Sequence, residues 1–251
     1  MSLVRTEVRD DVAIVTLDRP KANAFSPELV HELLGALEAR EDARALVLTS
    51  ALPGMFSAGW DLPRLVDAGR PAMEAFVGAF CDLVRQLFVF GPPLVAALPG
   101  HAIAGGLIVA MGADERVAAR GRGKVGLSEV ILGVSVPQCL MEPFRHVVGP
   151  RHMERLAATG ENLSMDEALA VGLIDRIVPA EELLDRALDR ARFLAGLASS
   201  AHAAIKRRSR AAAIARFDAA RDHDPFLDLW FAEDARFRIK DMVARLTSRE
   251  P

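Results

Sequence analysis

Short hydrophobic runs alternate with helical patterns along the first half of the chain. The runs VAIVTL (12–17), ALVLT (45–49) and LVAAL (94–98) are short and aliphatic, which is typical of buried strands. Between the first two runs, Ser26 is suited to cap a helix in which leucines recur at helical spacing to about Arg40. This alternation predicts an α/β fold of strands joined by crossover helices.

A second change from helix to strand is indicated near residue 165. Ser164 and Glu167 have the spacing of a capping box, which marks the start of a short helix. Gly172 stands where a glycine would end that helix, and residues 173–178 (LIDRIV) are predicted to be extended.

The remainder of the chain is predicted to be helical. From about Glu181, alanine, leucine, arginine and aspartate recur with helical period, with an interruption near Asp224. We expect a core over residues 1–195 and a C-terminal helical region over residues 196–251. The apolar faces of this region could pack on the core or on a second subunit, and periodicity alone does not choose between them.

The composition is that of an ordinary globular protein, and no nucleic acid is expected as a partner. Of the 251 residues, 51% are apolar and 26% are charged, and the net charge is -3, so there is no general positive field for a nucleic-acid backbone. The longest apolar runs, such as residues 105–111, are too short to span a bilayer. The first ten residues mix acids and bases without a following apolar segment, so we expect a cytoplasmic protein.

Neither the cysteines nor the histidines have the spacing of a metal site. Cys81 and Cys139 are far apart and form no CxxC motif, so we expect reduced, structural thiols. His101 follows the third strand without a serine, cysteine or carboxylate partner at a recognisable spacing, so a structural role is favoured. No bound metal is expected.

Two glycine-containing segments follow the second and third predicted strands. In the segment 55–62, Gly59 allows the backbone to approach a ligand closely. In the segment 100–108, Gly105 and Gly106 lead into an apolar helix, whose first N–H groups are free to bind negative charge. Each motif alone is more typical of a structural turn, but two such amides can form an oxyanion hole.

Five motifs in order carry a resemblance to a known family. They are RPKANAFSPEL (19–29), TSALPGMFSAGWDL (49–62), PLVAALPGHAIAGGLIVAMGAD (93–114), GLSEVILGV (126–134) and TGENLSMDEALAVGLIDRIV (159–178). In this order the chain resembles the enoyl-CoA hydratase/isomerase (crotonase) superfamily over nearly its whole length. The resemblance implies a crotonase-like spiral of ββα units, a C-terminal helical oligomerisation region, homotrimers or hexamers, and an acyl-CoA thioester as substrate, with no cofactor besides the coenzyme A that the substrate carries.

The resemblance also implies a site. The oxyanion-hole amides would be those of Trp60 and Gly105, and the indole of Trp60 could line the acyl pocket or belong to the core. Asp61 could contact coenzyme A or simply cap the helix that follows it. The residues that would contact coenzyme A are Lys21, Ala22, Ala24, Ala58, Asp61 and Leu62.

The expected reaction depends on the number of carboxylates. Hydratases of this superfamily carry two catalytic glutamates, and the matching positions here are Ile108 and Glu129. Hydration needs one carboxylate to activate water and another to handle the proton. A 1,3 proton shift needs only one base, and burial in an apolar pocket should raise its pKa. Glu129 is therefore the expected catalytic base.

The resemblance is closest to the mitochondrial type of Δ3,Δ2-enoyl-CoA isomerase, an enzyme of fatty-acid degradation. Another crotonase chemistry, such as that of an enoyl-CoA hydratase, a decarboxylase or a thioester hydrolase, stays open. So does a non-catalytic relative that binds acyl-CoA or RNA. The basic run 206–210 (KRRSR) is interpreted either as a solvated helix face or as a contact for the phosphates of coenzyme A.

Overall fold

A six-stranded sheet forms the centre of the molecule. The computed structural model describes residues 2–248 of the chain. The strand order is β1-β2-β3-β5-β7-β10, with β1 antiparallel to β2 and all other neighbours parallel. These strands are β1 (Val4–Arg9), β2 (Val12–Leu17), β3 (Ala45–Ser50), β5 (Leu94–Leu98), β7 (Glu115–Ala119) and β10 (Arg176–Val178).

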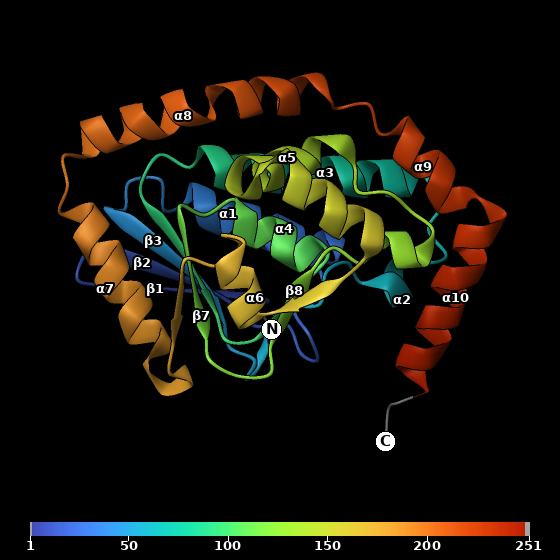
Figure 1. Ribbon diagram of the computed structural model, residues 1–251, viewed down its shortest axis with the longest axis horizontal. Coiled ribbons are helices and arrows are strands. Elements are labelled where there is room, and N and C mark those ends of the chain that lie inside the picture. The colour runs from blue at the N-terminus through green and yellow to red at the C-terminus, as the bar shows by residue number, and fades with distance from the viewer. Residues whose placement is uncertain (1, 249–251) are drawn as a thin grey trace.

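A smaller sheet has the order β4-β6-β8-β9. Its strands are β4 (Met55–Ser57), β6 (His101–Ile103), β8 (Lys124–Gly126) and β9 (Asn162–Ser164). The chain passes from the large sheet to the small one and then into a helix three times: β3, β4 and α3; β5, β6 and α4; β7, β8 and α5. This is the expected spiral of ββα units (Figure 1).

The inner strands β2, β3 and β5 are buried on both faces, which explains why they are continuous hydrophobic runs, whereas the edge strand β1 is mostly exposed. Alternate side chains point to opposite faces. One set packs on helix α7: Val12, Ile14, Val47, Val95 and Val117. The other set faces the main core under α1 and α3: Ala13, Val15, Leu46, Leu48 and Ala96.

The core helices predicted at about residues 27–40, after Gly105 and after Ser164 are present, whereas the two longest core helices, at 70–89 and 141–159, were not predicted. Ser26 caps α1 and accepts a hydrogen bond from the N–H of Leu29 at 3.4 Å. The capping box at Ser164 is formed, and the helix after it ends before Gly172. The core helices are α1 (Pro27–Glu38), α2 (Leu62–Leu65), α3 (Arg70–Val89), α4 (Gly105–Met111), α5 (Met141–Thr159), α6 (Met165–Ala170) and α7 (Leu183–Ala195). Three short 3₁₀ helices are η1 (Glu129–Leu132), η2 (Gln138–Leu140) and η3 (Ala180–Glu182).

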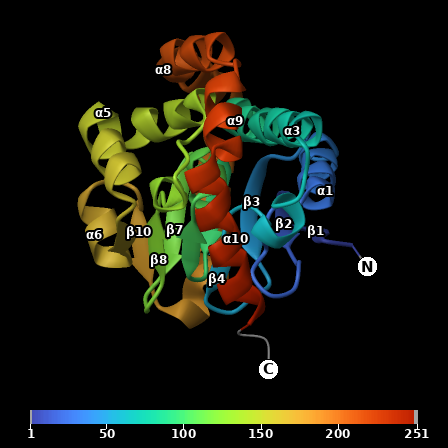
Figure 2. The ribbon, with the colours of Figure 1, turned by 90° about the vertical axis from the view of Figure 1, so that its right-hand side faces the viewer.

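The C-terminal helices wrap around the core. They are α8 (Ser199–Ala219), α9 (Asp224–Phe231) and α10 (Glu233–Thr247). Helix α8 crosses over α3 and α5, and α9 and α10 then descend along one end of the molecule (Figures 1 and 2). Phe217, Phe226 and Trp230 from these helices are buried in the main core. The C-terminal region thus packs on its own core, while its predicted role in oligomer formation stays a prediction.

Two cations of the basic run 206–210 are buried. The Nζ of Lys206 lies 2.8 Å from one carboxylate oxygen of Asp114, and Nη2 of Arg210 lies 2.9 Å from the other. Arg210 also donates to the carbonyls of Phe88 at 2.7 Å and Gly112 at 3.2 Å, which lie at the ends of α3 and α4. Both earlier interpretations of the run are therefore wrong for these two side chains, which anchor α8 to the core.

None of the helices between residues 2 and 248 is long and apolar enough to cross a membrane.

Candidate active site

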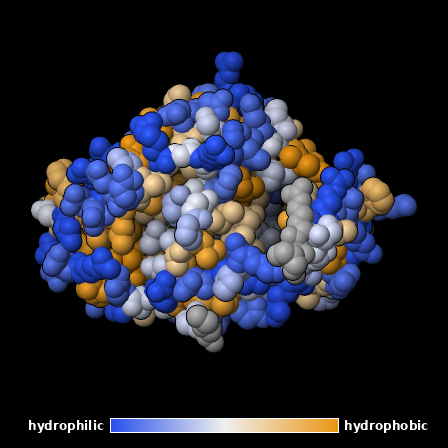
Figure 3. Space-filling model, turned by 90° about the horizontal axis from the view of Figure 1, so that it is seen from below, coloured by the Kyte–Doolittle hydropathy of each residue, from blue (hydrophilic) through white to orange (hydrophobic). Residues whose placement is uncertain are grey.

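One cavity of about 990 Å³ brings together all nine residues that the family resemblance implied. It opens between the loops that follow β2, β4 and β6, the start of η1, and helices α9 and α10. Viewed from below, hydrophobic surface occupies the hollowed middle of the face within a hydrophilic rim (Figure 3). The lining of the cavity includes Trp60, Gly105, Glu129, Lys21, Ala22, Ala24, Ala58, Asp61 and Leu62.

The two glycine loops touch each other at this cavity. A Cβ atom added to Gly59 would lie 3.2 Å from the amide nitrogen of Gly105 and 3.0 Å from the carbonyl oxygen of Ile103. Gly59 also has a φ of +92°, a conformation that side chains rarely adopt. Glycine is therefore required at position 59 for both space and backbone geometry.

The two amides at this contact have no acceptor within the described residues. Phe25 donates to the carbonyl of Gly59 at 2.7 Å and accepts from the N–H of Asp61 at 3.0 Å, so the N–H of Trp60, between them, points away from Phe25. The N–H of Gly105 belongs to the first turn of α4, where no intrahelical acceptor exists. Two free donors from neighbouring loops are the arrangement that an oxyanion hole requires.

The residues around Gly105 hold its amide in place. Ala104 has a φ of +50°, an unfavourable value for a residue with a Cβ atom, and its N–H donates to the carbonyl of Gly126 at 2.8 Å. A Cβ atom on Gly106 would lie 2.5 Å from the carbonyl oxygen of Ser57. Helix α4 can therefore approach β4 this closely only because residue 106 is glycine.

We expect Gly106→Ala to impair both stability and turnover. The added methyl group meets backbone and would push α4 away from β4, at a cost of about 1 to 3 kcal/mol of unfolding free energy. Because the amide of Gly105 would move with the helix, kcat/KM should fall at least about tenfold. Urea unfolding and steady-state kinetics would measure the two effects.

Gly78→Ala is the matched control, because a Cβ atom there meets nothing within 4 Å in the interior of α3. It should stabilise the protein by up to about 1 kcal/mol and leave turnover unchanged. Equal kinetics for Gly106→Ala and the control would refute the proposed importance of the α4 position.

Glu129 begins the 3₁₀ helix η1 at the wall of the cavity. Burial raises the pKa of its carboxyl from 4.5 to about 7, and backbone hydrogen bonds at Glu129 and Ser128 offset only part of this effect. Its Oε2 is buried and has no hydrogen-bond partner in the described structure. A carboxyl group with a pKa near neutrality and a free oxygen is suited to accept and return a proton.

The other walls of the cavity are mainly apolar. Ile108, from α4, lines the cavity and is 2% exposed, so no second carboxylate stands at that position. The indole of Trp60 packs edge-on against Phe76 and Phe226, with ring centres 5.0 Å and 5.5 Å apart. Trp60 also lies 6.3 Å from Trp230. The side chain of Trp60 therefore lines the cavity and also belongs to the aromatic core, so both interpretations of this residue apply.

The loop that carries the predicted coenzyme A contacts is held by an ion pair. The guanidinium of Arg19 pairs with the carboxylate of Asp61 and donates to the carbonyl of Ala24 at 2.9 Å. Asp61 also accepts from the N–H of Arg64 and caps α2, so its structural interpretation is confirmed. The N–H of Ala58 donates to the carbonyl of Ala22 at 3.0 Å. The contacts with coenzyme A themselves stay a prediction.

Asn23, which no sequence motif singled out, organises this loop. Its side chain is fully buried and donates to the carbonyl of Phe56 at 3.0 Å and to the hydroxyl of Ser50 at 2.7 Å. Its φ of +47° lies in the left-handed region, which asparagine tolerates better than most residues. An asparagine between two alanines after a strand was the available signal.

His101 has the structural role that was expected. Its Nδ1 accepts a hydrogen bond from the N–H of Lys124 at 3.2 Å, which joins the starts of β6 and β8. It is not part of the cavity lining.

Comparison with known proteins identifies the family of the chain. Residues 7–228 match the family described as enoyl-CoA hydratase/isomerase. The human mitochondrial enoyl-CoA delta isomerase 1 is 32% identical over 226 residues, which cover 88% of this chain and 75% of that protein. Carnitinyl-CoA dehydratase from Escherichia coli K12 is 33% identical over 195 residues, 76% of this chain and 74% of that one.

Solved structures show the same fold. The crystal structure of human mitochondrial delta3-delta2-enoyl-CoA isomerase superposes with a TM-score of 0.93 at 30% identity, and the match covers 99% of this chain and 100% of that chain. An enoyl-CoA hydratase/isomerase family protein from Pseudomonas syringae gives a TM-score of 0.84 at 30% identity over 89% of this chain and 96% of the other. The expected crotonase-like fold is confirmed, and the chain belongs to the enoyl-CoA hydratase/isomerase family.

Proposed function

We propose that the protein is a Δ3,Δ2-enoyl-CoA isomerase. The observation that supports this most directly is that only one of the two glutamate positions of the hydratases holds a carboxylate: Glu129 lines the cavity with a raised pKa, and apolar Ile108 occupies the second position. Family membership alone leaves the reaction open, because the relatives include both an isomerase and a dehydratase.

In the proposed mechanism, the thioester carbonyl oxygen lies against the N–H groups of Trp60 and Gly105. The carboxylate of Glu129 removes a proton from C2, and the electrons move into the carbonyl to form an enolate whose oxygen both amides stabilise. The protonated Glu129 then gives the proton to C4 as the double bond forms between C2 and C3. One group acts first as base and then as acid, so no water and no separate cofactor takes part.

The shape of the cavity supports a carrier-bound substrate. We propose that the coenzyme A part follows the loop of Lys21, Ala22, Ala24 and Ala58, which lines the cavity. The acyl chain would then enter the apolar end, which Ile131, Leu132, Phe226, Trp230 and Leu246 line.

The defining experiment is to supply a trans-3-enoyl-CoA and follow the ultraviolet absorbance of the conjugated 2-enoyl product. In parallel, chromatography would test for a hydroxyacyl-CoA formed from the 2-enoyl ester. Isomer without hydrated product supports the proposal. Hydrated product at a comparable rate, or no conversion of a 3-enoyl ester that binds, contradicts it.

The pH profile should follow the ionisation of Glu129. Only the carboxylate can accept the first proton, and its pKa is about 7. We therefore expect kcat/KM to rise about tenfold per pH unit below pH 7 and to level off above it. Steady-state assays between about pH 5 and pH 9 would measure this. A flat profile across that range would exclude a base with the raised pKa.

A further inference from the structure

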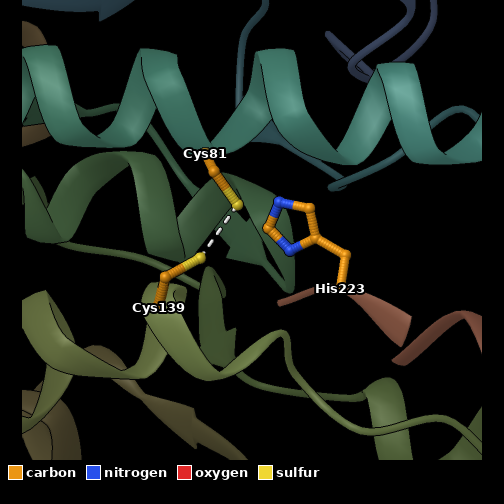
Figure 4. A group of neighbouring side chains, drawn as sticks. All are labelled: Cys81, Cys139 and His223. Carbon is orange, nitrogen blue, oxygen red and sulfur yellow. Dashed lines mark hydrogen bonds between the residues drawn. The ribbon is translucent and has the colours of Figure 1, made fainter. Parts of the chain in front are cut away.

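Two cysteines that are distant in sequence meet a histidine beneath the aromatic end of the cavity. Cys81 lies in the middle of α3, Cys139 in η2, and His223 in the turn that precedes α9. One ligand atom from each lies within 4.8 Å of those of the other two. Figure 4 shows the two sulfurs side by side, with the nitrogen-bearing edge of the imidazole turned toward them.

The cysteine pair is closely spaced. The Sγ atoms are 3.0 Å apart, and both side chains are fully buried. The positive charge of Arg221 acts on both sulfurs, and Arg221 is paired with Asp82 at 2.7 Å. Two buried sulfurs at this spacing are positioned to share one metal ion as thiolates.

His223 completes the set with a free nitrogen. Its Nδ1 is buried and has no hydrogen-bond partner within the described structure. A neutral imidazole nitrogen is a common metal ligand. A buried nitrogen without a partner normally costs free energy, and a metal ion shared with the two sulfurs would give it one.

We propose that Cys81, Cys139 and His223 bind a zinc ion. The donor set is two soft thiolates and an imidazole, which zinc prefers, and a water molecule would complete the tetrahedron. Binding replaces both thiol protons, so each zinc ion taken up releases two protons and forms two Zn–S bonds. His223 is half-buried and follows exposed Asp222, which gives the ion a path from the surface.

A disulfide is the competing use of the same sulfurs. Zinc at about 2.3 Å from each sulfur would hold them about 3.8 Å apart, whereas a disulfide bond is about 2.05 Å long. The observed Sγ–Sγ distance of 3.0 Å lies between these values, so it does not distinguish a zinc site from a disulfide. His223 favours the zinc site, because a disulfide would leave its Nδ1 without a partner, whereas zinc would bind all three groups.

The ion would join three elements that form the wall of the cavity. Phe80 precedes Cys81 on α3 and packs on Trp60 at 5.5 Å. Leu140 follows Cys139 and lines the cavity, as does Phe226 at the start of α9. Zinc would therefore fix the C-terminal helices against the core at the acyl end of the cavity.

The test is zinc binding by the full-length reduced protein. The chain is treated with a thiol-free reductant, stripped of metal with a chelator, dialysed against zinc, and analysed for bound metal and for unfolding temperature. We expect one zinc ion per chain and a higher unfolding temperature. Cobalt in place of zinc should give the charge-transfer absorption of thiolate ligands.

The variants Cys139→Ser and His223→Ala should each bind zinc at least about a hundredfold more weakly. His202→Ala is the matched control, because His202 in α8 also has a buried, unpartnered Nδ1 but belongs to no such cluster in the described structure. It should bind zinc as wild type does. No zinc binding in the reduced wild type, equal binding in all variants, or a disulfide that forms whether or not zinc is present would overturn the proposal. These readouts do not depend on the isomerase reaction.

Discussion

Replacing Glu129 with glutamine is expected to reduce isomerisation at least about a hundredfold, as the loss of a general base should. The amide has nearly the same shape, so the walls of the cavity and the two N–H groups stay in place. Glutamine cannot accept the proton from C2. Asp61 is the one other carboxylate among the described residues of the cavity, and it is paired with Arg19. The measurement is steady-state turnover of a trans-3-enoyl-CoA, together with binding of a saturated acyl-CoA.

The same substitution should make the protein more stable at alkaline pH. The pKa of Glu129 is raised on folding, so its contribution is most favourable at low pH and is lost as pH rises through about 7, where this buried carboxyl, whose Oε2 has no partner in the described structure, must ionise. Glutamine does not ionise. We expect it to stabilise the fold above pH 7 by up to about 3 kcal/mol and to have little effect near pH 5, as measured by urea unfolding at both values.

Glu161→Gln provides the control for both effects. Glu161 is exposed and forms only a loose ion pair with Arg155 at 3.4 Å. Its loss should leave turnover unchanged and shift stability by less than about 1 kcal/mol. If Glu129→Gln kept wild-type turnover while binding acyl-CoA normally, the proton would have to be carried by another group, and the proposed mechanism would fail.

The second large effect is expected from Asp114→Asn. This carboxylate pairs with Lys206 at 2.8 Å and Arg210 at 2.9 Å, and it also accepts from the N–H of Leu94 at 2.8 Å. Removing its charge leaves two buried cations uncompensated. Burial already lowers the pKa of Lys206 to about 8, which shows how poorly this site tolerates free positive charge. We expect a loss of about 3 to 5 kcal/mol.

Urea unfolding at neutral pH would measure this loss, with Asp218→Asn as the matched control. Asp218 binds Arg85 through both oxygens, at 2.6 Å and 2.9 Å, but the pair is exposed. Removing that charge should cost less than about 1 kcal/mol. Similar losses for the two variants would mean that the contacts of Asp114 contribute no more than a surface ion pair does.

The inner strands and helix α1 could be predicted from the sequence because local patterns determine them, whereas α3 and α5 were not predicted. The strands at 12–17, 45–50 and 94–98 are buried on both faces and are therefore continuously hydrophobic. The strands of the small sheet, such as Lys124–Gly126, have three residues and no period that could be recognised. Residues 173–175 were expected to be extended, but only Arg176–Val178 pairs with a neighbouring strand.

The site could be predicted as far as it depends on short motifs. Gly59, Gly105 and Glu129 each lie in a continuous motif, and the order of the five motifs along the chain, rather than any one of them, carried the prediction. The ion pair of Arg19 with Asp61 could not be foreseen in the same way, because those residues are distant in sequence. The meeting of the two cysteines with a histidine is a still longer-range product of the fold.

The short helix α4 has a consequence for anyone who would change this protein by directed evolution. It begins at the amide of Gly105 and ends at the carbonyl of Gly112, where Arg210 from α8 donates its hydrogen bond. At seven residues it is a rod of only about 10 Å. Mutations on α8 that shift the hydrogen bond from Arg210 to Gly112 would move the amide of Gly105, which is one of the two proposed oxyanion donors. Libraries aimed at reaction rate should therefore include the α8 positions around Arg210, although they lie outside the cavity.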